Sequence, residues 1–174
     1  MSVAAIVLAT GPSNEQGPPK QLVPLRGNTL LRETVLAARA SACDEVCVVL
    51  GANALLIAPA LADVDVVFEH NLGWREGIVS SIRCGMRWAR RAGHGSIVIC
   101  VCDQPALTAN HLDALIEKHR AVGRSVVTRH AGVLGLPAVF EPNELATLLA
   151  VDNRDSPALG IDWARGKAPE VLVS

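Results

Sequence analysis

Two polar segments of the sequence carry residue types suited to binding a phosphate and a metal ion. The first, residues 10–20, contains Gly11 and closes on Lys20. Glycines let a backbone turn tightly and present its N–H groups to an anion, and a nearby lysine adds a positive charge. The second is Cys102-Asp103-Gln104-Pro105, where a carboxylate directly follows an apolar run. That carboxylate either holds Mg²⁺ against substrate phosphates or accepts hydrogen bonds from loop amides.

A third segment, residues 71–85, places Ser80 and Ser81 in the first turn of an expected helix. The N–H groups at the start of a helix have no partner within it and favour anions. Hydroxyls and amides at this position either read a base edge or a phosphate, or they cap the helix. Neither common nucleotide loop is present, because there is no G-x-G-x-x-G and Gly17 is followed by proline rather than Lys-Ser/Thr.

The sequence lacks the signatures of several other classes of enzyme and metal site. The five cysteines include no C-x-x-C pair or zinc-ligand spacing, which indicates reduced core residues in a cytoplasmic protein. Cys100 and Cys102 would point to the same face of a strand, into the core. There is no G-x-S-x-G elbow for a serine hydrolase. A dehydrogenase is disfavoured because the dinucleotide loop is missing.

Composition and charge argue against two classes of binding partner, nucleic acids and membranes. Of the 174 residues, half are apolar, only 3% are aromatic, and the net charge is −1. This balance disfavours a nucleic-acid partner, which calls for a basic surface and aromatic side chains that stack on bases. The N-terminus lacks a basic segment and a cleavage site, and no apolar run approaches the length of a membrane span. We therefore expect a soluble, cytoplasmic protein without a membrane partner.

The elements that must position these residues alternate between short apolar runs and amphipathic stretches. Runs that are apolar on both faces are typical of a parallel sheet covered by helices. The expected strands are residues 3–9, 45–50, 64–69, 96–101, 125–129 and 170–173. The expected helices are residues 29–41, 52–61 (interrupted by Pro59), 77–92, 108–122 and 142–151. The pattern predicts one domain, residues 1–174, folded as a three-layer α/β/α sandwich with a mostly parallel, Rossmann-like sheet. Ligands of such sheets bind beyond the carboxyl ends of the strands.

Taken in order, four motifs resemble those of the molybdenum cofactor nucleotidyltransferase family, especially its cytidylyltransferase branch. Residues 8–20 follow the family pattern L-A-A-G-x-S-x-R-x-G-x-P-K in length and frame, and Cys102-Asp103-Gln104-Pro105 matches G-D-Q-P. The pattern G-x-P-x-x-F matches the run from Gly135 to Phe140. The patterns N-x-x-W-x-x-G and S-S-x-x-x-G are matched by Asn71, Trp74, Gly77, Ser80, Ser81 and Gly85. The resemblance spans about residues 3 to 160.

This resemblance implies a Rossmann-like nucleotidyltransferase fold and a set of roles. The first loop would cradle a triphosphate neutralised by Lys20, and Asp103 would hold Mg²⁺, with Asp155 as a second metal ligand. The residues facing the nucleotide would be Leu8, Ala9, Thr10, Gly11 and Ser81. Family members join CMP or GMP to the terminal phosphate of molybdopterin, and the start of the loop favours CTP over GTP. A molybdoenzyme would then receive the cofactor.

Three departures from the family pattern leave alternatives open. Glu15 stands where the family has arginine, Cys102 replaces a glycine, and the late G-D-x-G-A-R motif is altered at Pro157 and Leu159. One alternative is therefore a degenerate homologue that binds nucleotide or chaperones a cofactor without catalysis. The other is a sugar-phosphate nucleotidyltransferase, which shares the opening loop and the metal-binding aspartate.

Overall fold

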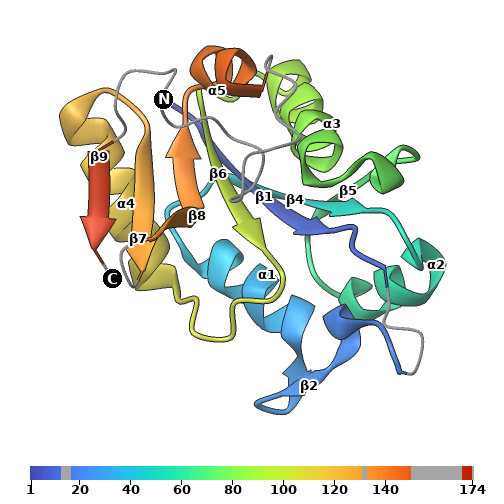
Figure 1. The fold of residues 1–174 in the computed structure, drawn as a ribbon. Coiled ribbons are helices and arrows are strands. Elements are labelled where there is room, and N and C mark those ends of the chain that lie inside the picture. The colour runs from blue at the N-terminus through green and yellow to red at the C-terminus, as the bar shows by residue number, and fades with distance from the viewer. Residues whose placement is uncertain (13–16, 131–132, 150–169, 174) are drawn as a thin grey trace.

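A single sheet forms the centre of the molecule (Figure 1). The computed structural model describes residues 1–12, 17–130, 133–149 and 170–173, and within these ranges the sheet has seven strands in the order β5-β4-β1-β6-β8-β7-β9. The strands are β1 (Val3–Ala9), β4 (Glu45–Leu50), β5 (Val67–His70), β6 (Ser96–Val101), β7 (Val126–His130), β8 (Val133–Phe140) and β9 (Glu170–Val173). The last strand lies where the sequence predicts it.

Most of the sheet is parallel. Strand β1 pairs in parallel with β4 on one side and β6 on the other, and β5 pairs in parallel with β4. Strand β8 runs antiparallel to both of its neighbours, β6 and β7, and β9 is again parallel to β7. The reversal has a simple cause, because a two-residue connection between β7 and β8 suits a hairpin and is far too short for a parallel crossover. The mostly parallel sheet predicted from the sequence is confirmed.

Helices cover both faces of the sheet and complete the three-layer sandwich (Figure 1). Helices α1 (Leu30–Ala40) and α4 (Ala109–Val122) pack on one face, and α3 (Ile78–Arg91) and α5 (Pro142–Leu149) pack on the other. The remaining elements are short: α2 (Ala54–Ile57), the 3₁₀ turns η1 (Lys20–Leu22), η2 (Ala58–Leu61) and η3 (Trp74–Glu76), and the ribbon of β2 (Pro24–Leu25) and β3 (Asn28–Thr29). None of the helices in the described ranges is both long and apolar enough to traverse a lipid bilayer.

Local sequence signals explain where the helices begin and end. The hydroxyl of Thr29 caps α1 by accepting a hydrogen bond from the Arg32 N–H at 3.2 Å, and Thr108 caps α4 in the same way. Helix α4 stops at Gly123, whose φ of 63° is left-handed. Strand β5 begins three residues later than predicted, because the Val64 N–H donates to the Leu61 carbonyl and extends the preceding turn.

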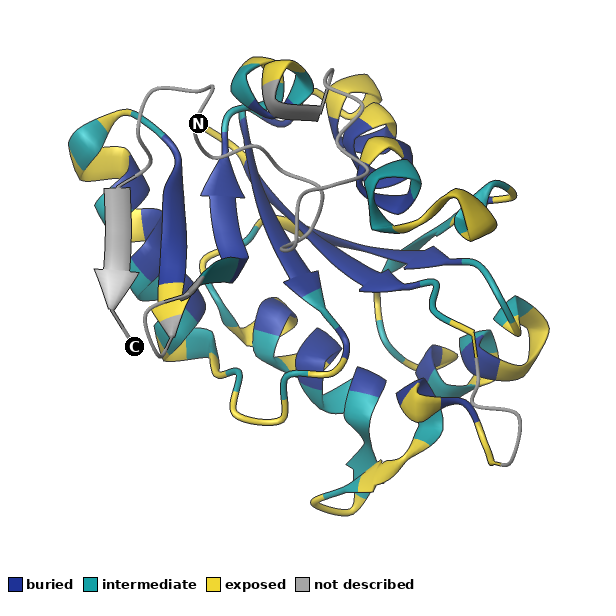
Figure 2. Ribbon diagram, in the orientation of Figure 1, coloured by how far each residue is buried: buried dark blue, intermediate teal, exposed yellow. Residues whose placement is uncertain are grey.

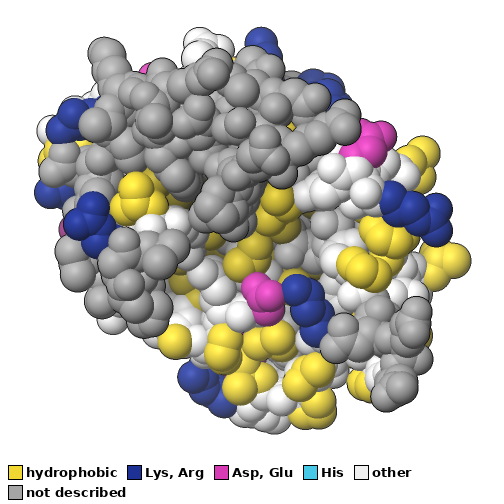
Figure 3. Space-filling view, viewed as in Figure 1, with side chains coloured by type: hydrophobic (Ala, Val, Ile, Leu, Met, Phe, Trp, Pro, Cys, Tyr) yellow, Lys and Arg dark blue, Asp and Glu magenta, His cyan; other side chains and the backbone are white. Residues whose placement is uncertain are grey.

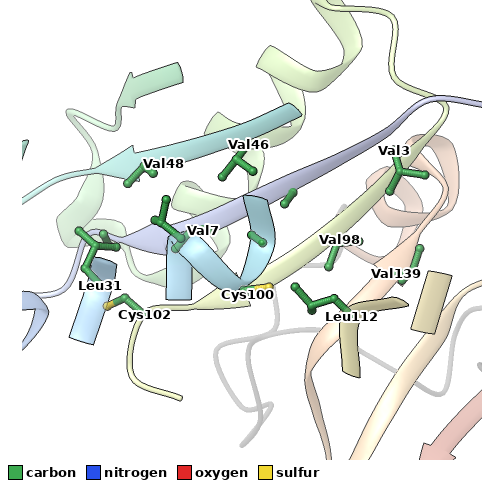
Figure 4. Packing of buried hydrophobic residues seen from close by; sticks show 14 of the residues in the cluster. Val3, Val7, Leu31, Val46, Val48, Val98, Cys100, Cys102, Leu112 and Val139 are labelled. Carbon is green, nitrogen blue, oxygen red and sulfur yellow. The ribbon is translucent and has the colours of Figure 1, made fainter. Parts of the chain in front are cut away.

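The sheet is buried on both faces, as the dark strands of Figure 2 show. All seven residues of β1 are buried, and they alternate between the two helix layers, with Val7 facing α1 and Ile6 facing α3. Gly85 brings α3 close to the sheet, since a Cβ there would lie 2.5 Å from Ile6 Cγ2. Cys100 and Cys102 lie in the core on the α1–α4 side, as the sequence predicts (Figure 4).

Candidate active site

The segments that follow β1, β5 and β6 meet at the carboxyl edge of the parallel strands. They surround a cleft of about 400 Å³. In the space-filling view of Figure 3, hydrophobic side chains line a hollow, with acidic and basic groups side by side at its border. The cleft is lined by Leu8, Thr10, Gly11, Pro12, Lys20, Trp74, Gly77, Ile78, Val101, Cys102 and Asp103. Segments far apart in the sequence therefore meet at the edge where ligands of open α/β sheets bind.

An ion pair joins the two predicted catalytic residues across this cleft. Lys20 Nζ donates to Asp103 Oδ2 at 2.9 Å, and the two side chains are 48% and 44% exposed. The hydrogen bond to Asp103 raises the pKa of Lys20, so the lysine is charged at neutral pH. Lys20 reaches this position because η1 folds back after the loop, and Asp103 because it directly follows the buried end of β6. The structure thus brings together a cation suited to phosphates and a carboxylate suited to a metal.

The floor of the cleft is the end of β1. Leu8, Thr10 and Gly11 line it, whereas the Ala9 side chain is fully buried. The loop is held by Gln21, whose Nε2 donates to the carbonyls of Ala9 at 3.2 Å and Gly11 at 3.1 Å. Gln21, which is completely buried beside the exposed Lys20, was not predicted from the sequence. Its signal was an amide-bearing side chain directly after the loop lysine.

Ser81 lies beneath the cleft and does not line it. It is completely buried, and its hydroxyl is hydrogen-bonded to Thr10 Oγ1 at 2.8 Å. Asn71 Nδ2 donates to the same Ser81 oxygen at 3.0 Å and to Ser80 Oγ at 2.8 Å. The Ser80 hydroxyl also contacts the carbonyls of Gly73 and Gly77. The polar residues of the third sequence segment therefore form a network under Thr10.

One wall of the cleft is Trp74, whose ring carries the Arg75 guanidinium 4.8 Å above its centroid. Close packing sets the position of this wall. A Cβ at Gly51 would lie 2.7 Å from the Trp74 Cβ and 2.9 Å from the Thr10 Cβ. Only a glycine after β4 lets the tryptophan and the β1 loop approach this closely. The segment that contains Trp74 also contributes Gly77, whose φ of 98° turns the chain into α3.

The described residues fit a metal held largely by the substrate. No cluster of three or more histidine, cysteine or acidic residues suited to a metal occurs among them. Mg²⁺ is commonly held by one or two carboxylates together with substrate phosphates, and Asp103 supplies such a carboxylate at the cleft. The Cys102 side chain is only 2% exposed and lies beside Leu31 in the core (Figure 4), although the residue also lines the cleft next to Asp103. The predicted ligand Asp155, together with Glu15, Pro157 and Leu159, lies outside the described residues.

The chain matches the model of one known protein family. The model of the MobA-like NTP transferase domain covers residues 5–161, which include most of β1, the Lys20 loop and the Asp103 segment. The chain belongs to this family. The resemblance drawn from the motifs is thereby confirmed, and so is the Rossmann-like nucleotidyltransferase fold.

Relatives of this MobA-like domain carry several different names. A nicotine blue oxidoreductase of Paenarthrobacter nicotinovorans is 34% identical over 122 residues, which cover 68% of the chain and 57% of that protein. A probable molybdenum cofactor guanylyltransferase of Opitutus terrae is 31% identical over 147 residues, covering 84% of the chain and 70% of that protein. The bifunctional protein GlmU of Mycolicibacterium paratuberculosis is 32% identical, but the match spans only 29% of its length. The chain therefore spans little more than half of the first of these relatives.

Solved structures share the same fold. Rv0371c from Mycobacterium tuberculosis superposes with a TM-score of 0.78 at 25% identity, covering 99% of this chain and 88% of that protein. Its homologue from Mycobacterium sp. strain JC1 superposes with a TM-score of 0.75 at 27% identity, covering 99% and 85%. A nucleotidyl transferase from Methanothermobacter at 24% identity has a TM-score of 0.76 and covers 86% and 76%, a likeness of fold alone.

Proposed function

We propose that this MobA-like domain transfers a nucleoside monophosphate from an NTP to a phosphorylated acceptor and releases pyrophosphate. The observation that carries the proposal is the ion pair between Lys20 and Asp103, whose nitrogen and oxygen atoms are 2.9 Å apart. It lies at the cleft, and the end of β1 forms the floor of this cleft. A lysine that neutralises phosphates and a carboxylate that binds a divalent cation are the two charges that such a reaction needs. Family membership supports the same reaction class.

The proposed reaction asks little covalent chemistry of the protein. The phosphate of the acceptor attacks the α-phosphorus in line; a new P–O bond forms as the bond to the β-phosphate oxygen breaks. The nucleophile is already ionised, so no strong general base is required. The chain contributes by positioning and by neutralising charge, with Lys20 at the phosphates and the N–H groups of the β1 loop around them. The group held by Asp103, Mg²⁺, would polarise the phosphates when bound.

We assign the nucleotide-binding surface to the end of β1. Leu8, Thr10 and Gly11 would contact the nucleotide, and Ala9 would contribute only through its backbone. Ser81 would act through Thr10, which it holds by a hydrogen bond of 2.8 Å. Asp155 stays a proposed second metal ligand. The single-domain reading of residues 1–174 also stays a proposal.

We propose that the nucleotide donor is CTP rather than GTP and that the acceptor resembles molybdopterin. A molybdoenzyme would receive the product. The support for this acceptor is the family and the Opitutus relative, whose name specifies a guanylyltransferase. The support for CTP is the loop start Leu8-Ala9-Thr10-Gly11, in which the third position carries a side chain. For the metal, a manganese complex of the structural neighbour Rv0371c adds support for a divalent cation.

The experiment that tests the proposal is thermal unfolding with CTP, GTP, ATP and UTP, each with and without Mg²⁺, and with NADH as a separate ligand. A ligand at about a hundred times its Kd stabilises the native state by about 2.7 kcal/mol. For a domain of this size the shift in Tm is roughly 5–10 °C. We expect a Mg²⁺-dependent shift with CTP that exceeds the others. No shift with any NTP at millimolar concentration contradicts the proposal, and a shift with NADH alone points to the oxidoreductase chemistry named for the Paenarthrobacter relative.

A sugar-phosphate acceptor is the second candidate, favoured by the similarity to GlmU. Measuring pyrophosphate release with a sugar 1-phosphate and with a molybdopterin preparation, at the same NTP concentration, separates the two acceptors. Nucleotide binding without pyrophosphate release from either would favour the degenerate, binding-only alternative.

A further inference from the structure

The outer face of α3 carries a row of arginines. Arg83, Arg87 and Arg90 follow one another at intervals of four and three residues, the spacing that places side chains on one side of a helix. All three are exposed, and Figure 2 shows exposed residues along the outer side of α3. We call these three residues the arginine row. Arg91 lies outside the row, because its guanidinium is bound to the Glu69 carboxylate at 2.6 Å.

The row concentrates positive charge in a chain that is otherwise acidic. Residues 74–93 contain five arginines and one glutamate, and α3 itself contains no acidic residue. The whole chain has 16 basic and 17 acidic residues, so the part outside this segment has 11 basic and 16 acidic ones. Basic side chains in the last turn of a helix complement its dipole, which gives Arg90 a structural explanation. Arg83 and Arg87 lie further inside the helix, where the dipole gives no such explanation.

The length of the row suits an extended ligand rather than a small ion. An α-helix rises about 1.5 Å per residue, so the row runs roughly 10 Å along α3. An ion pair exposed to solvent contributes little by itself, and a small anion on one of these side chains would be held weakly. A ligand whose acidic groups repeat at the same spacing engages several arginines at once.

The surroundings of the row favour a protein among the large anionic partners. Binding to an anionic membrane through a helix calls for apolar side chains that insert beside the basic ones, and the large hydrophobic side chains exposed in the described residues all lie outside α3. Domains that bind nucleic acid are typically basic as a whole and use aromatic side chains. This chain has a net charge of −1, and the aromatic residue of α3, Trp88, is buried. An acidic protein surface needs only complementary charge at the helical spacing.

The arginine row lies beside the cleft. Helix α3 begins at Ile78, which lines the cleft together with Gly77. Just before the helix, the exposed Arg75 lies over the ring of Trp74, which forms one wall of the cleft. A further arginine is therefore placed at the end of α3 that meets the cleft. A partner bound along α3 borders the opening of the cleft.

We propose that the arginine row, extended by Arg75, docks an acidic surface of a partner protein, a helix with carboxylates at the same spacing. The position suits the protein that receives the product of the cleft, an identification that rests on the proposed nucleotidyl transfer. The docking itself rests on the row. Its ion pairs are exposed to solvent, so they speed association and weaken as salt is added.

The test uses two peptides that differ only in where their charges lie. Both are alanine-based helices of the same length with the same number of glutamates, which lie on one face in the first peptide and around the helix in the second. Binding to the full chain is measured by fluorescence anisotropy at low and at high NaCl concentration. We expect the one-face peptide to bind at least about fivefold more tightly than the other, and salt to weaken it.

Three results would overturn the proposal. The first is equal binding of the two peptides, and the second is no binding of the one-face peptide at low salt. The third is tighter binding of a DNA duplex, or of phosphatidylserine vesicles, than of the one-face peptide at the same salt concentration. That result would assign the row to a nucleic acid or to a membrane.

Variants locate the peptide on α3. Arg87→Glu together with Arg90→Glu reverses two charges of the row and should weaken binding of the one-face peptide about tenfold or more. Arg39→Glu together with Arg120→Glu makes the same change in net charge at exposed arginines of α1 and α4, and should alter binding by less than about twofold. Arg87→Lys together with Arg90→Lys keeps the charges and should retain binding. Equal losses in the two glutamate variants would show a response to net charge alone and overturn the proposal.

Thermal unfolding of the same protein with CTP and Mg²⁺ separates this inference from the proposed function. If the one-face peptide does not bind while CTP stabilises the protein, only the docking fails. If CTP does not stabilise the protein, the proposed function fails, and with it the identification of the partner as the receiver of the product. The docking is still decided by the two peptides.

Discussion

Lys20 and Asp103 neutralise each other across 2.9 Å, so each charge in the cleft has a competing partner. A triphosphate that engages Lys20 competes with the Asp103 carboxylate, and a divalent cation that engages Asp103 competes with the lysine. A metal-bound nucleotide satisfies both residues at once, because it brings a cation for the carboxylate and an anion for the ammonium. At the scale of single residues, we therefore expect the ion pair to favour the complex of metal and nucleotide over either one alone.

Asp103→Asn separates these two effects. The substitution removes the charge that competes for Lys20, so we expect metal-free CTP binding to strengthen several-fold. It also removes the proposed metal ligand, so the stimulation by Mg²⁺ should disappear and turnover should fall by two orders of magnitude or more. Titration of each protein with CTP, with and without Mg²⁺, measures both. Asp65→Asn, at a side chain that is 91% exposed, serves as the control, and an unaltered Mg²⁺ response in the Asp103 variant would remove Asp103 from the site.

Glu15→Arg tests whether Glu15, which lies outside the described residues, faces the triphosphate. In the family pattern this loop position is an arginine, and the glutamate places a negative charge in the loop proposed to hold the triphosphate. A unit charge pair at 4 Å is worth roughly 4 kcal/mol at an effective dielectric of about 20, and solvent reduces this at an exposed loop. We expect the arginine to tighten CTP binding tenfold or more, measured by calorimetry. Weaker or unchanged binding would mean that Glu15 does not face the phosphates.

The sequence identifies the charged residues of the site better than the buried ones. Lys20 and Asp103 were predicted because the carboxyl ends of parallel strands converge, and the structure pairs them. The burial of Ser81 and the role of Gln21 were not predicted, because both depend on how the loops fold back over one another. From the sequence, a hydroxyl in the first turn of a helix is equally compatible with contact to a ligand and with contact to the protein. The packing of α3 against β1 buries Ser81 and directs its hydroxyl to Thr10.

At the scale of elements, the alternation of apolar strands and amphipathic helices was enough to predict the layers. The ends of most strands match because β-branched runs end at polar or glycine-rich segments. The apolar pattern did not predict β8 (Val133–Phe140), which was singled out only as the G-x-P-x-x-F run, and it gave no sign of the antiparallel direction of that strand. It also placed the start of β5 too early, because a turn hydrogen bond from Val64 is invisible in hydrophobicity.

Gly85→Ala tests the contact between α3 and the sheet. The added Cβ would lie 2.5 Å from Ile6 Cγ2 and 3.2 Å from Val49 Cγ2, both in fully buried side chains that have little room to move. Overpacking of this kind costs typically about 1–3 kcal/mol. We expect a loss of that size in the free energy of unfolding, measured with urea. Gly135→Ala, where no atom lies within 4 Å of the added Cβ, should change it by less than about 0.5 kcal/mol.

At the scale of the whole molecule, one carboxylate ties the start of β1 to the start of β4. Asp44 Oδ2 accepts a hydrogen bond from the Val3 N–H at 2.7 Å, and this bond lowers the pKa of Asp44 below its usual value. A lowered folded-state pKa means that the ionised carboxylate stabilises the native state. The stabilisation is complete above the unfolded pKa near 3.8 and is lost as the pH falls through the folded value.

Asp44→Ala should therefore destabilise the protein in a pH-dependent way. Hydrogen bonds to charged groups contribute more than neutral ones, but exposure to solvent reduces the gain here, so we expect a loss of about 0.5–1 kcal/mol at pH 7. The difference from the unmodified protein should shrink as the pH falls below about 4. Urea unfolding at pH 7 and pH 3 measures it. A difference that is the same at both pH values would show that the carboxylate charge has no part in it.

The central place of β1 has a consequence for how the protein opens. This strand is buried along its whole length and is hydrogen-bonded on both sides, and its last residues lead into the floor of the cleft. Backbone amides in such a position exchange with solvent only when the entire domain unfolds, whereas those of edge strands and surface turns exchange through local opening. The loop proposed to meet the nucleotide is therefore anchored in the part of the chain that we expect to exchange most slowly. We expect any motion that accompanies ligand binding to occur in the surrounding walls, while the floor stays in place.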